Sequence, residues 1–107
     1  MKASDYIARR LAHWGLDTCF AVTGGGAMHL NDSFGVEPAI RVRYMHHEQA
    51  CSMAAEAYGR VTGRPAVLNV TTGPGGLNAF NGVFGAFTDS TPMVVIGGQS
   101  RRDTMSS

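Results

Sequence analysis

The chain has 107 residues, of which 44% are hydrophobic, and nine basic against eight acidic side chains give a formal charge of +1. This length allows one small α/β domain with a modest core, below the usual size for an enzyme that binds cofactor and substrate unaided. The balanced charge, with no basic run beyond Arg101 and Arg102, argues against a nucleic-acid or anionic membrane surface and favours small-molecule or protein partners.

Cysteine usage and the N-terminus indicate the compartment. Only Cys19 and Cys51 are present, without metal or redox spacing, and the first residues lack the apolar segment of a signal peptide. We therefore expect a reducing cytoplasm and no segment that spans a bilayer.

The first half of the chain alternates helix-like and strand-like patterns. A helix is expected from Ala3 or Ser4, and Gly15 is placed to stop it. Its three-to-four-residue spacing is carried by Tyr6, Ile7, Arg10, Leu11 and Trp14. A strand over 17–22 then enters a glycine turn, which a short helix over 27–34 follows. In that helix the residues available for burial are Met28, Leu30 and Phe34.

The second half continues the alternation. An alternating apolar and charged strand over 40–44 precedes an alanine-rich helix over 47–62, whose small side chains allow close packing on a neighbour. The remaining expected elements are a buried strand over 65–70, a turn over 72–76, a helix over 77–87 and an apolar strand over 92–97. This order predicts a parallel sheet covered by helices on both faces.

The domain organisation follows from the same pattern. Residues 1–99 are expected to form one domain, and the polar residues 100–107, which show no helix or strand pattern of their own, are expected to be a linker or a cut point. We therefore expect a fragment of a longer multidomain chain.

Glu48 is the residue that first suggests a ligand site. In parallel sheets, ligands bind at the carboxyl ends of the strands. The glycine turn after Val22, the segment before Glu48 and the turn after Val70 all lie at such ends. Glycines there permit close backbone approach, and the helix starts offer unpaired N–H groups, although glycines also serve simply as turn formers.

Known motifs narrow the chemistry. The stretch from Gly24 to His29 lacks the third glycine of a dinucleotide fingerprint, and no phosphate-binding Gly-x-x-x-x-Gly-Lys-Ser/Thr run occurs, which disfavours a nucleotide-binding module. The zinc-protease helix motif fails because Cys51 replaces its second histidine. Cys51 is instead expected to be a small core residue, since no base partner for a cysteine nucleophile is evident.

Four ordered blocks of sequence carry a resemblance to a known family. They are Phe20–Ala27, His46–Ala50 with Ala54–Gly63, Thr71–Asn78, and Asp89–Gln99. The pattern closely resembles the N-terminal, pyrimidine-binding domain of thiamine diphosphate-dependent enzymes of the acetolactate synthase, pyruvate oxidase and benzoylformate decarboxylase superfamily. The resemblance covers nearly the whole chain and implies the thiamine diphosphate-binding fold of the pyrimidine type.

The resemblance implies a role for Glu48. It matches the family glutamate that hydrogen-bonds the aminopyrimidine ring nitrogen para to the amino group and so favours the imino tautomer, whose nitrogen removes the thiazolium proton. Without the resemblance, Glu48 would be interpreted as a helix-start glutamate favoured by the helix dipole. Glu56 is expected to make only a surface or interface hydrogen bond.

The resemblance also assigns other positions. Cofactor-binding residues are implied at Thr23, Gly24, Gly25, Pro74, Asn78 and Gln99, besides Glu48. Two histidines, His29 and His46, could face substrate, although a histidine more often makes a structural hydrogen bond. No metal ligand is expected in this chain. In the family, the diphosphate and Mg²⁺ are held by a separate domain with a Gly-Asp-Gly segment, which the chain lacks.

The implied activity is that of a 2-oxo-acid decarboxylase or carboligase acting on pyruvate or a similar small acid. The active site would form with the diphosphate-binding domain of another subunit or chain, so a homodimer or homotetramer is implied, and the isolated chain would be inactive. The alternative is a non-catalytic assembly domain, or truncated piece, that self-associates without cofactor. The sequence does not decide the acyl acceptor or whether FAD is bound.

One loop departs from the common acetolactate synthase pattern. Thr23 and Gly24 stand where a Tyr-Pro pair is usual, and His29 stands where Pro or Leu is frequent. The loop looks more like a subgroup associated with nucleotide-sugar and surface-polysaccharide pathways.

Overall fold

Four parallel strands form the sheet of this protein in a computed structural model that describes residues 1–105. The strands are β1 (Thr18–Ala21), β2 (Arg41–Tyr44), β3 (Ala66–Val70) and β4 (Met93–Gly97), and they lie in the order β2-β1-β3-β4. Cys19 of β1 aligns with Val42 and Val67, and Val67 aligns with Val94 of β4. The α/β fold with a parallel sheet, predicted from the sequence, is confirmed.

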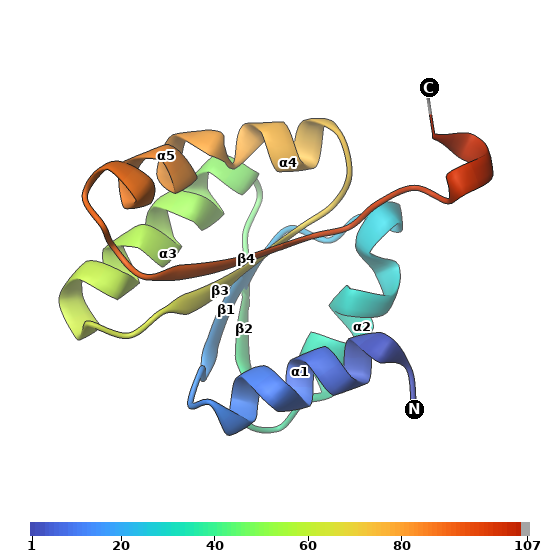
Figure 1. Cartoon of the computed structure of the whole chain (residues 1–107), viewed down its shortest axis with the longest axis horizontal. Helices are drawn as coiled ribbons and strands as arrows, with labels where there is room; N and C mark the ends of the chain where they lie inside the picture. The colour runs from blue at the N-terminus through green and yellow to red at the C-terminus, as the bar shows by residue number, and fades with distance from the viewer. Residues whose placement is uncertain (106–107) are drawn as a thin grey trace.

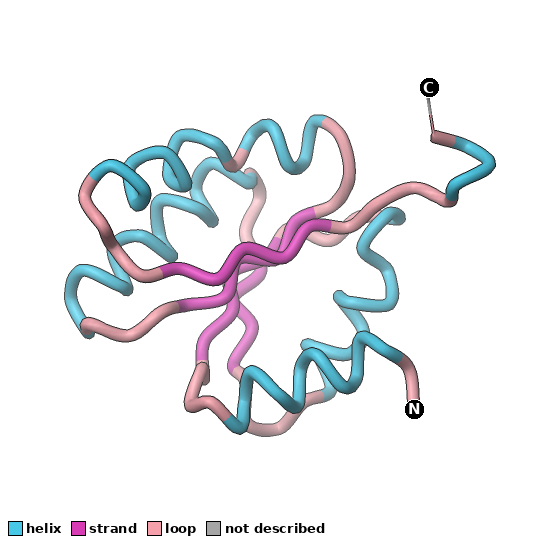
Figure 2. Tube along the Cα trace, in the orientation of Figure 1, coloured by secondary structure: helices cyan, strands magenta, loops and turns pink. Residues whose placement is uncertain are grey.

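Helices cover both faces of the sheet (Figures 1 and 2). One face carries α1 (Ala3–His13) and α2 (Met28–Val36), which a short 3₁₀ turn at Gly25–Ala27 precedes. The other carries α3 (Glu48–Thr62), α4 (Pro74–Asn78) and α5 (Phe80–Thr88). None of the helices among residues 1–105 combines the length and hydrophobicity needed to cross a membrane.

The core is divided by the sheet into two apolar clusters. Leu11, Phe34 and Val67 lie in the cluster under α1 and α2, whereas Cys51 and Leu68 lie in the cluster under α3 and α5. All five residues of β3 are buried. A central parallel strand with helices on both faces loses water from both faces, which explains why its residues other than Asn69 are apolar.

The apolar face of α1 differs from the predicted one. Ala8 and Leu11 are buried, but Tyr6 and Trp14, which follow the same spacing, are 50% and 65% exposed. The guanidinium of Arg10 lies 5.3 Å from the ring centroid of Tyr6 and 5.8 Å from that of Trp14. Cation–π contacts on the outer face therefore account for the aromatic spacing, and Ala8 and Leu11 make the inner contact.

Helix boundaries also differ in places. Met28 is 60% exposed, so its predicted burial was wrong, while Phe34 is buried as predicted. The helix expected over 77–87 is two helices, because Pro74 starts a first turn early and α4 ends at Asn78, leaving one residue before α5 begins at Phe80. In the polar tail a short 3₁₀ turn forms at Arg102–Thr104, where no helix was expected; Ser106 and Ser107 lie outside the described residues.

Helices α3 and α5 lie side by side at a distance that only glycine permits. A Cβ built on Gly82 of α5 would lie 2.3 Å from the carbonyl carbon of Ser52 on α3. The amide of Gly82 donates a hydrogen bond to Ser52 Oγ at 3.2 Å, and that hydroxyl donates to the carbonyl of Gln49 at 3.0 Å. The close packing that the small side chains of α3 indicated is therefore present, with a polar contact at its centre.

Candidate functional site

The loops after β1, β3 and β4 meet at the carboxyl edge of the sheet. A Cβ on Gly24 would lie 2.5 Å from Thr71 Cβ, and one on Gly26 would lie 2.3 Å from Thr72 Cγ2. A Cβ on Gly98 would lie 2.2 Å from the carbonyl oxygen of Gly26. These separations are too short for any side chain, so glycine is needed at these positions for the three loops to pack together. We call the edge that these loops form, at the carboxyl ends of the strands, the rim.

Asn31 holds the glycine turn in place. Its Oδ1 accepts a hydrogen bond from the amide of Gly24 at 3.1 Å, across seven residues of sequence. Asn31 lies on α2, so the helix that follows the turn also fixes its start. Asn31 was not among the predicted residues, because an asparagine inside a helix carries no pattern that marks a loop contact.

Glu48 is the first residue of α3 and is partly buried. The preceding His47 caps the helix, since its Nδ1 accepts a hydrogen bond from the amide of Gln49 at 3.1 Å. The cap fixes where α3 begins and therefore fixes the backbone position from which the Glu48 side chain projects. A carboxylate in the first turn is also favoured by the helix dipole.

Glu48 and Asn78, both predicted site residues, are in contact. Asn78 Nδ2 at the end of α4 donates to Glu48 Oε2 at 3.1 Å. The other oxygen, Oε1, faces Gly75, where an added Cβ would lie 3.5 Å from it and 2.6 Å from Thr71 Cγ2. The carboxylate therefore has one oxygen held by an amide and one beside the backbone of Gly75, which packs closely against Thr71.

Other predicted residues lie apart from this pair. His29 and Gln99 line a separate pocket of about 430 Å³ together with Gly25 and Gly26. His46 is exposed on the segment between β2 and α3. The structure thus groups one substrate candidate, His29, with two cofactor candidates, Gly25 and Gln99, and their roles stay predictions.

Pro74 and Thr23 are the remaining predicted positions. Pro74 is exposed at the first position of α4, four residues before Asn78, and Thr23 is exposed at the start of the glycine turn. Both lie on loops of the rim, so their position is compatible with ligand contact.

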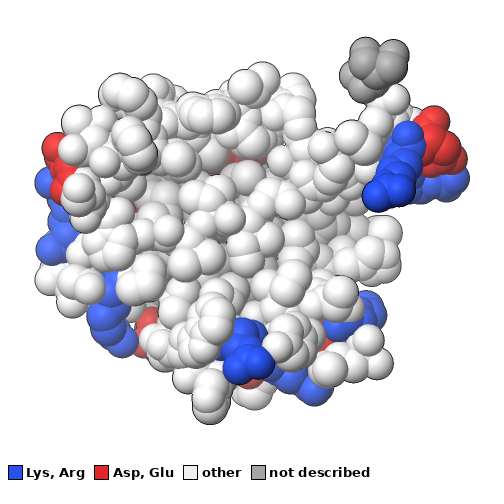
Figure 3. All heavy atoms as spheres, in the orientation of Figure 1, with Lys and Arg blue, Asp and Glu red and all other residues white. Residues whose placement is uncertain are grey.

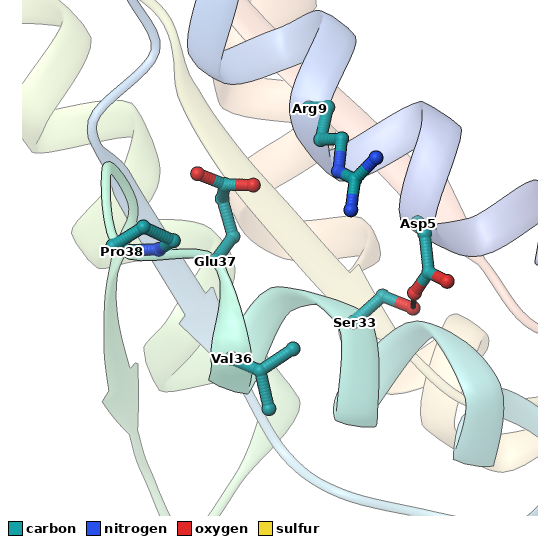
Figure 4. Close-up of a pocket in the computed structure, with 6 residues that line it drawn as sticks. All are labelled: Asp5, Arg9, Ser33, Val36, Glu37 and Pro38. Atoms are coloured by element: carbon teal, nitrogen blue, oxygen red, sulfur yellow. Dashed lines mark hydrogen bonds between the residues drawn. The ribbon is translucent and has the colours of Figure 1, made fainter. Parts of the chain in front are cut away.

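A further pocket lies away from the rim, between α1 and the end of α2 (Figure 4). Its volume is about 440 Å³, and it contains none of the predicted site residues. Ser33 Oγ donates to Asp5 Oδ1 there at 2.6 Å, and this bond is the main cause of the lowered pKa of Asp5. Arg9 and Glu37 face this space from opposite sides in Figure 4.

Neither cysteine suits nucleophilic chemistry. Burial raises the pKa of Cys51 to about 11, and the nearby charge of Glu48 raises it further. Burial likewise raises the pKa of Cys19 to about 12. Both thiols are fully buried and stay protonated near neutral pH, which confirms that Cys51 is a core residue.

We expect the stability of the fold to fall in alkali because of these thiols. Each has a folded-state pKa above the usual 9, so its contribution to stability is complete below pH 9 and is lost as pH rises toward 11 for Cys51 and toward 12 for Cys19. Urea unfolding at pH 8 and pH 10 measures this loss, and a Cys51→Ala variant should show a smaller difference between the two. Ellman's reagent at pH 8 should label neither thiol in the folded protein and both in urea; rapid labelling of folded protein would contradict this assignment.

Comparisons with known proteins agree with one another. The family model described as "Thiamine pyrophosphate enzyme, N-terminal TPP binding domain" matches residues 1–106. An acetolactate synthase large subunit of Buchnera aphidicola is 36% identical over 99 residues, covering 92% of this chain and 17% of that protein. Chloroplastic acetolactate synthases of Arabidopsis thaliana and Zea mays are 37% and 38% identical over 101 residues, covering 94% of this chain. The chain thus spans only 15–17% of the length of these relatives.

Proposed function

We propose that this chain is the pyrimidine-binding domain of a 2-oxo-acid decarboxylase or carboligase similar to acetolactate synthase. The chain belongs to the family of thiamine pyrophosphate enzymes and corresponds to their N-terminal TPP-binding domain. The observation that supports this most is the carboxylate of Glu48, held at the rim by Asn78 beside Gly75.

The residues at the rim fit an aminopyrimidine ring. Glu48 offers a carboxylate oxygen that can share a proton with a ring nitrogen, and Asn78 orients the carboxyl group through its amide. Gly75 lies beside the other oxygen of Glu48, and the absence of a side chain there lets its loop pack closely against Thr71. Pro74 and the turn from Thr23 to Gly25 would line or close the site. Thiamine diphosphate, when bound, supplies the carbanion chemistry that protein side chains lack.

In this proposal the chain itself controls where the proton on the aminopyrimidine ring lies. In this proposal Glu48 holds a proton at the ring nitrogen and so sets the tautomer of the aminopyrimidine, while the packed loops keep water from that nitrogen. The substrate would be pyruvate or a similar small 2-oxo acid, with His29 and His46 as candidates for its contacts. Mg²⁺ and the diphosphate group would be held by another domain.

The proposal includes a partner and an assembly. The diphosphate-binding domain of another subunit or chain would complete the site, in a homodimer or homotetramer located in the cytoplasm. Two related proteins carry the word chloroplastic in their names, so compartments differ among relatives.

The test is turnover by the longer protein that carries this domain. Purified with Mg²⁺ and thiamine diphosphate, it should consume pyruvate, followed by coupled spectrophotometry, and should lose that activity when the cofactor is withheld. If the protein with bound cofactor turned over none of the 2-oxo acids tried, the proposed decarboxylase or carboligase activity would be wrong.

The isolated 107-residue chain provides a separate expected result. Much of the affinity for thiamine diphosphate should come from its charged end, for which this chain has no site in the proposal. Calorimetric titration with thiamine diphosphate should therefore give weak or undetectable binding, and thiamine without the diphosphate should bind no more weakly than the full cofactor. Micromolar binding that depends on the diphosphate would contradict the division of the site between domains.

A further inference from the structure

Thr71 follows β3 directly, at the point where this interior strand of the sheet ends. All five residues of β3 are buried, and the strand pairs with β1 on one side and β4 on the other. The carbonyl of Val70, the residue before Thr71, accepts a hydrogen bond from the amide of Gly98 at 2.9 Å. The sheet therefore holds the backbone of Thr71, and the side chain projects from a fixed position.

The methyl group of Thr71 contacts two segments at once. A Cβ built on Gly24 would lie 2.5 Å from Thr71 Cβ and 2.6 Å from Thr71 Cγ2. A Cβ built on Gly75 would also lie 2.6 Å from that Cγ2. The Cα atom of each glycine lies one bond, about 1.5 Å, from the built Cβ, which leaves it in van der Waals contact with Thr71. Cγ2 is the Thr71 atom that both contacts share.

The two segments lead to opposite faces of the sheet (Figure 1). The turn with Gly24 leads into α2, whereas Gly75 lies at the start of α4, on the other face. Gly75 also lies beside Glu48, since its built Cβ would be 3.5 Å from Glu48 Oε1. One methyl group therefore supports both the turn that would close over the reaction centre and the glycine that the carboxylate of Glu48 faces.

Charged side chains do not fix the distance between these two segments. Residues 22–28 and 70–78 contain no Asp, Glu, Lys or Arg. Figure 3 shows one face of the molecule, on which the Lys and Arg side chains gather around the margin rather than over the middle. The separation of the glycine turn from the start of α4 therefore depends on the shape of the uncharged side chain packed against both.

The shape of threonine suits a fixed support. A side chain branched at Cβ has few accessible rotamers, so Cγ2 is held in one direction once the backbone is fixed. Gly24 and Gly75 bring backbone against this methyl group, and backbone cannot move aside as a flexible side chain can. Serine would lack the atom that both contacts share, whereas valine would keep it.

We propose that Thr71 is a positioning residue, whose methyl group fixes the separation between the glycine turn and the start of α4. It thereby sets where the reaction centre lies relative to the backbone that Glu48 faces. The effect on catalysis rests on the proposed function, whereas the effect on the two segments does not. Thr71 needs no contact with cofactor or substrate for this role.

Amide exchange in the 107-residue chain, followed by NMR, tests the support of the two segments. The reporters are the amide of Gly24, bonded to Asn31 Oδ1 at 3.1 Å, and the amide of Gly75, bonded to the carbonyl of Thr72 at 3.2 Å. Thr71→Ser should speed exchange of both amides about tenfold, because loss of the methyl group makes local opening easier. Thr71→Val should leave both rates within about twofold of wild type.

Thr91→Ser is the matched control. Thr91 precedes β4 at the opposite end of the sheet, where its Cγ2 lies 2.9 Å from a Cβ built on Gly59. The substitution removes the same methyl group from a contact with a glycine, so it reproduces the loss of packing away from the rim. Circular dichroism melting compares the stability of the two serine variants. Equal acceleration of exchange at Gly24 and Gly75 by both would overturn the proposal.

Turnover by the longer protein tests the effect on catalysis. Thr71→Ser should lower kcat for pyruvate about 10–100-fold, while KM for thiamine diphosphate changes by no more than about twofold. The split is expected because the ring keeps its contacts at Glu48, whereas the reacting atoms are misplaced. Thr71→Val should keep kcat within about threefold of wild type, and Thr91→Ser should leave it unchanged.

The two measurements can fail independently. A longer protein without activity toward any 2-oxo acid would contradict the proposed function, and exchange would still decide whether Thr71 supports both segments. Faster exchange at only one of the two glycines, or at neither, would show that the support is absent. Full kcat in Thr71→Ser would exclude the positioning role. An equal loss of kcat in Thr71→Ser and Thr71→Val would assign the effect to the hydroxyl group and contradict the role of the methyl group.

Discussion

Replacing Glu48 by Gln in the longer protein is expected to lower kcat by about 10²–10⁴-fold with thiamine diphosphate bound. Glutamine keeps the size of the side chain, and its oxygen can still accept the hydrogen bond that Asn78 donates at 3.1 Å. It cannot take up or release a proton at the ring nitrogen. Turnover of pyruvate, measured at saturating cofactor, separates this loss of proton control from a loss of cofactor binding.

Glu56→Gln is the matched control for that experiment. Glu56 lies on the same helix, two turns beyond Glu48, and its carboxylate forms a hydrogen-bonded ion pair with Arg60. The same chemical change at that position should leave kcat within about twofold, since the carboxylate of Glu56 is bonded to Arg60 of the same helix, two turns from the residue that faces the rim. If Glu48→Gln retained full turnover, the proposed role of Glu48 would be wrong whatever the control showed.

Gly82→Ala is expected to cost about 1–3 kcal/mol or more of the free energy of unfolding. The added methyl carbon would lie 2.3 Å from a backbone carbon of Ser52, so α3 and α5 would have to move apart. That movement would also break the hydrogen bond from the Gly82 amide to Ser52 Oγ. Urea unfolding of the isolated chain, monitored by circular dichroism, measures the change.

Gly85→Ala on the same helix tests the reason for this cost. A Cβ built on Gly85 has no heavy atom within 4 Å, so the substitution adds helix propensity without a clash. We expect it to stabilise the fold by up to about 1 kcal/mol. Equal destabilisation by the two alanines would show that the helix contact is not what makes Gly82 necessary.

Much of the fold is readable from the sequence because its signals are local. The buried run of β3 and the alternation of β2 each identify a strand, and Gly63 ends α3 in the left-handed conformation that glycine favours. The outward side of α1 was not predictable, since Tyr6 and Trp14 share the apolar spacing but contact Arg10 instead of the core. Spacing identifies a helix face and does not reveal which neighbour covers it.

The candidate site was predictable to a lesser extent. The family resemblance and the position of both residues at the same end of the sheet assign Glu48 and Asn78 to one site, and the hydrogen bond between them is a finding of the structure. The supporting contacts of Asn31 and His47 have no such signal, because histidine is not among the usual capping residues and Asn31 acts over seven positions. Residues that position a site depend on the tertiary structure, which local patterns do not encode.

The backbone contact between Gly98 and Gly26 affects how the rim can respond to a ligand. At these glycines no flexible side chain separates the loops, and the amide of Gly98 is also bonded to β3. The three loops therefore have little freedom to reorganise one at a time. An incoming ring would meet a surface that is already shaped, and the entropy cost of ordering it was met when the chain folded.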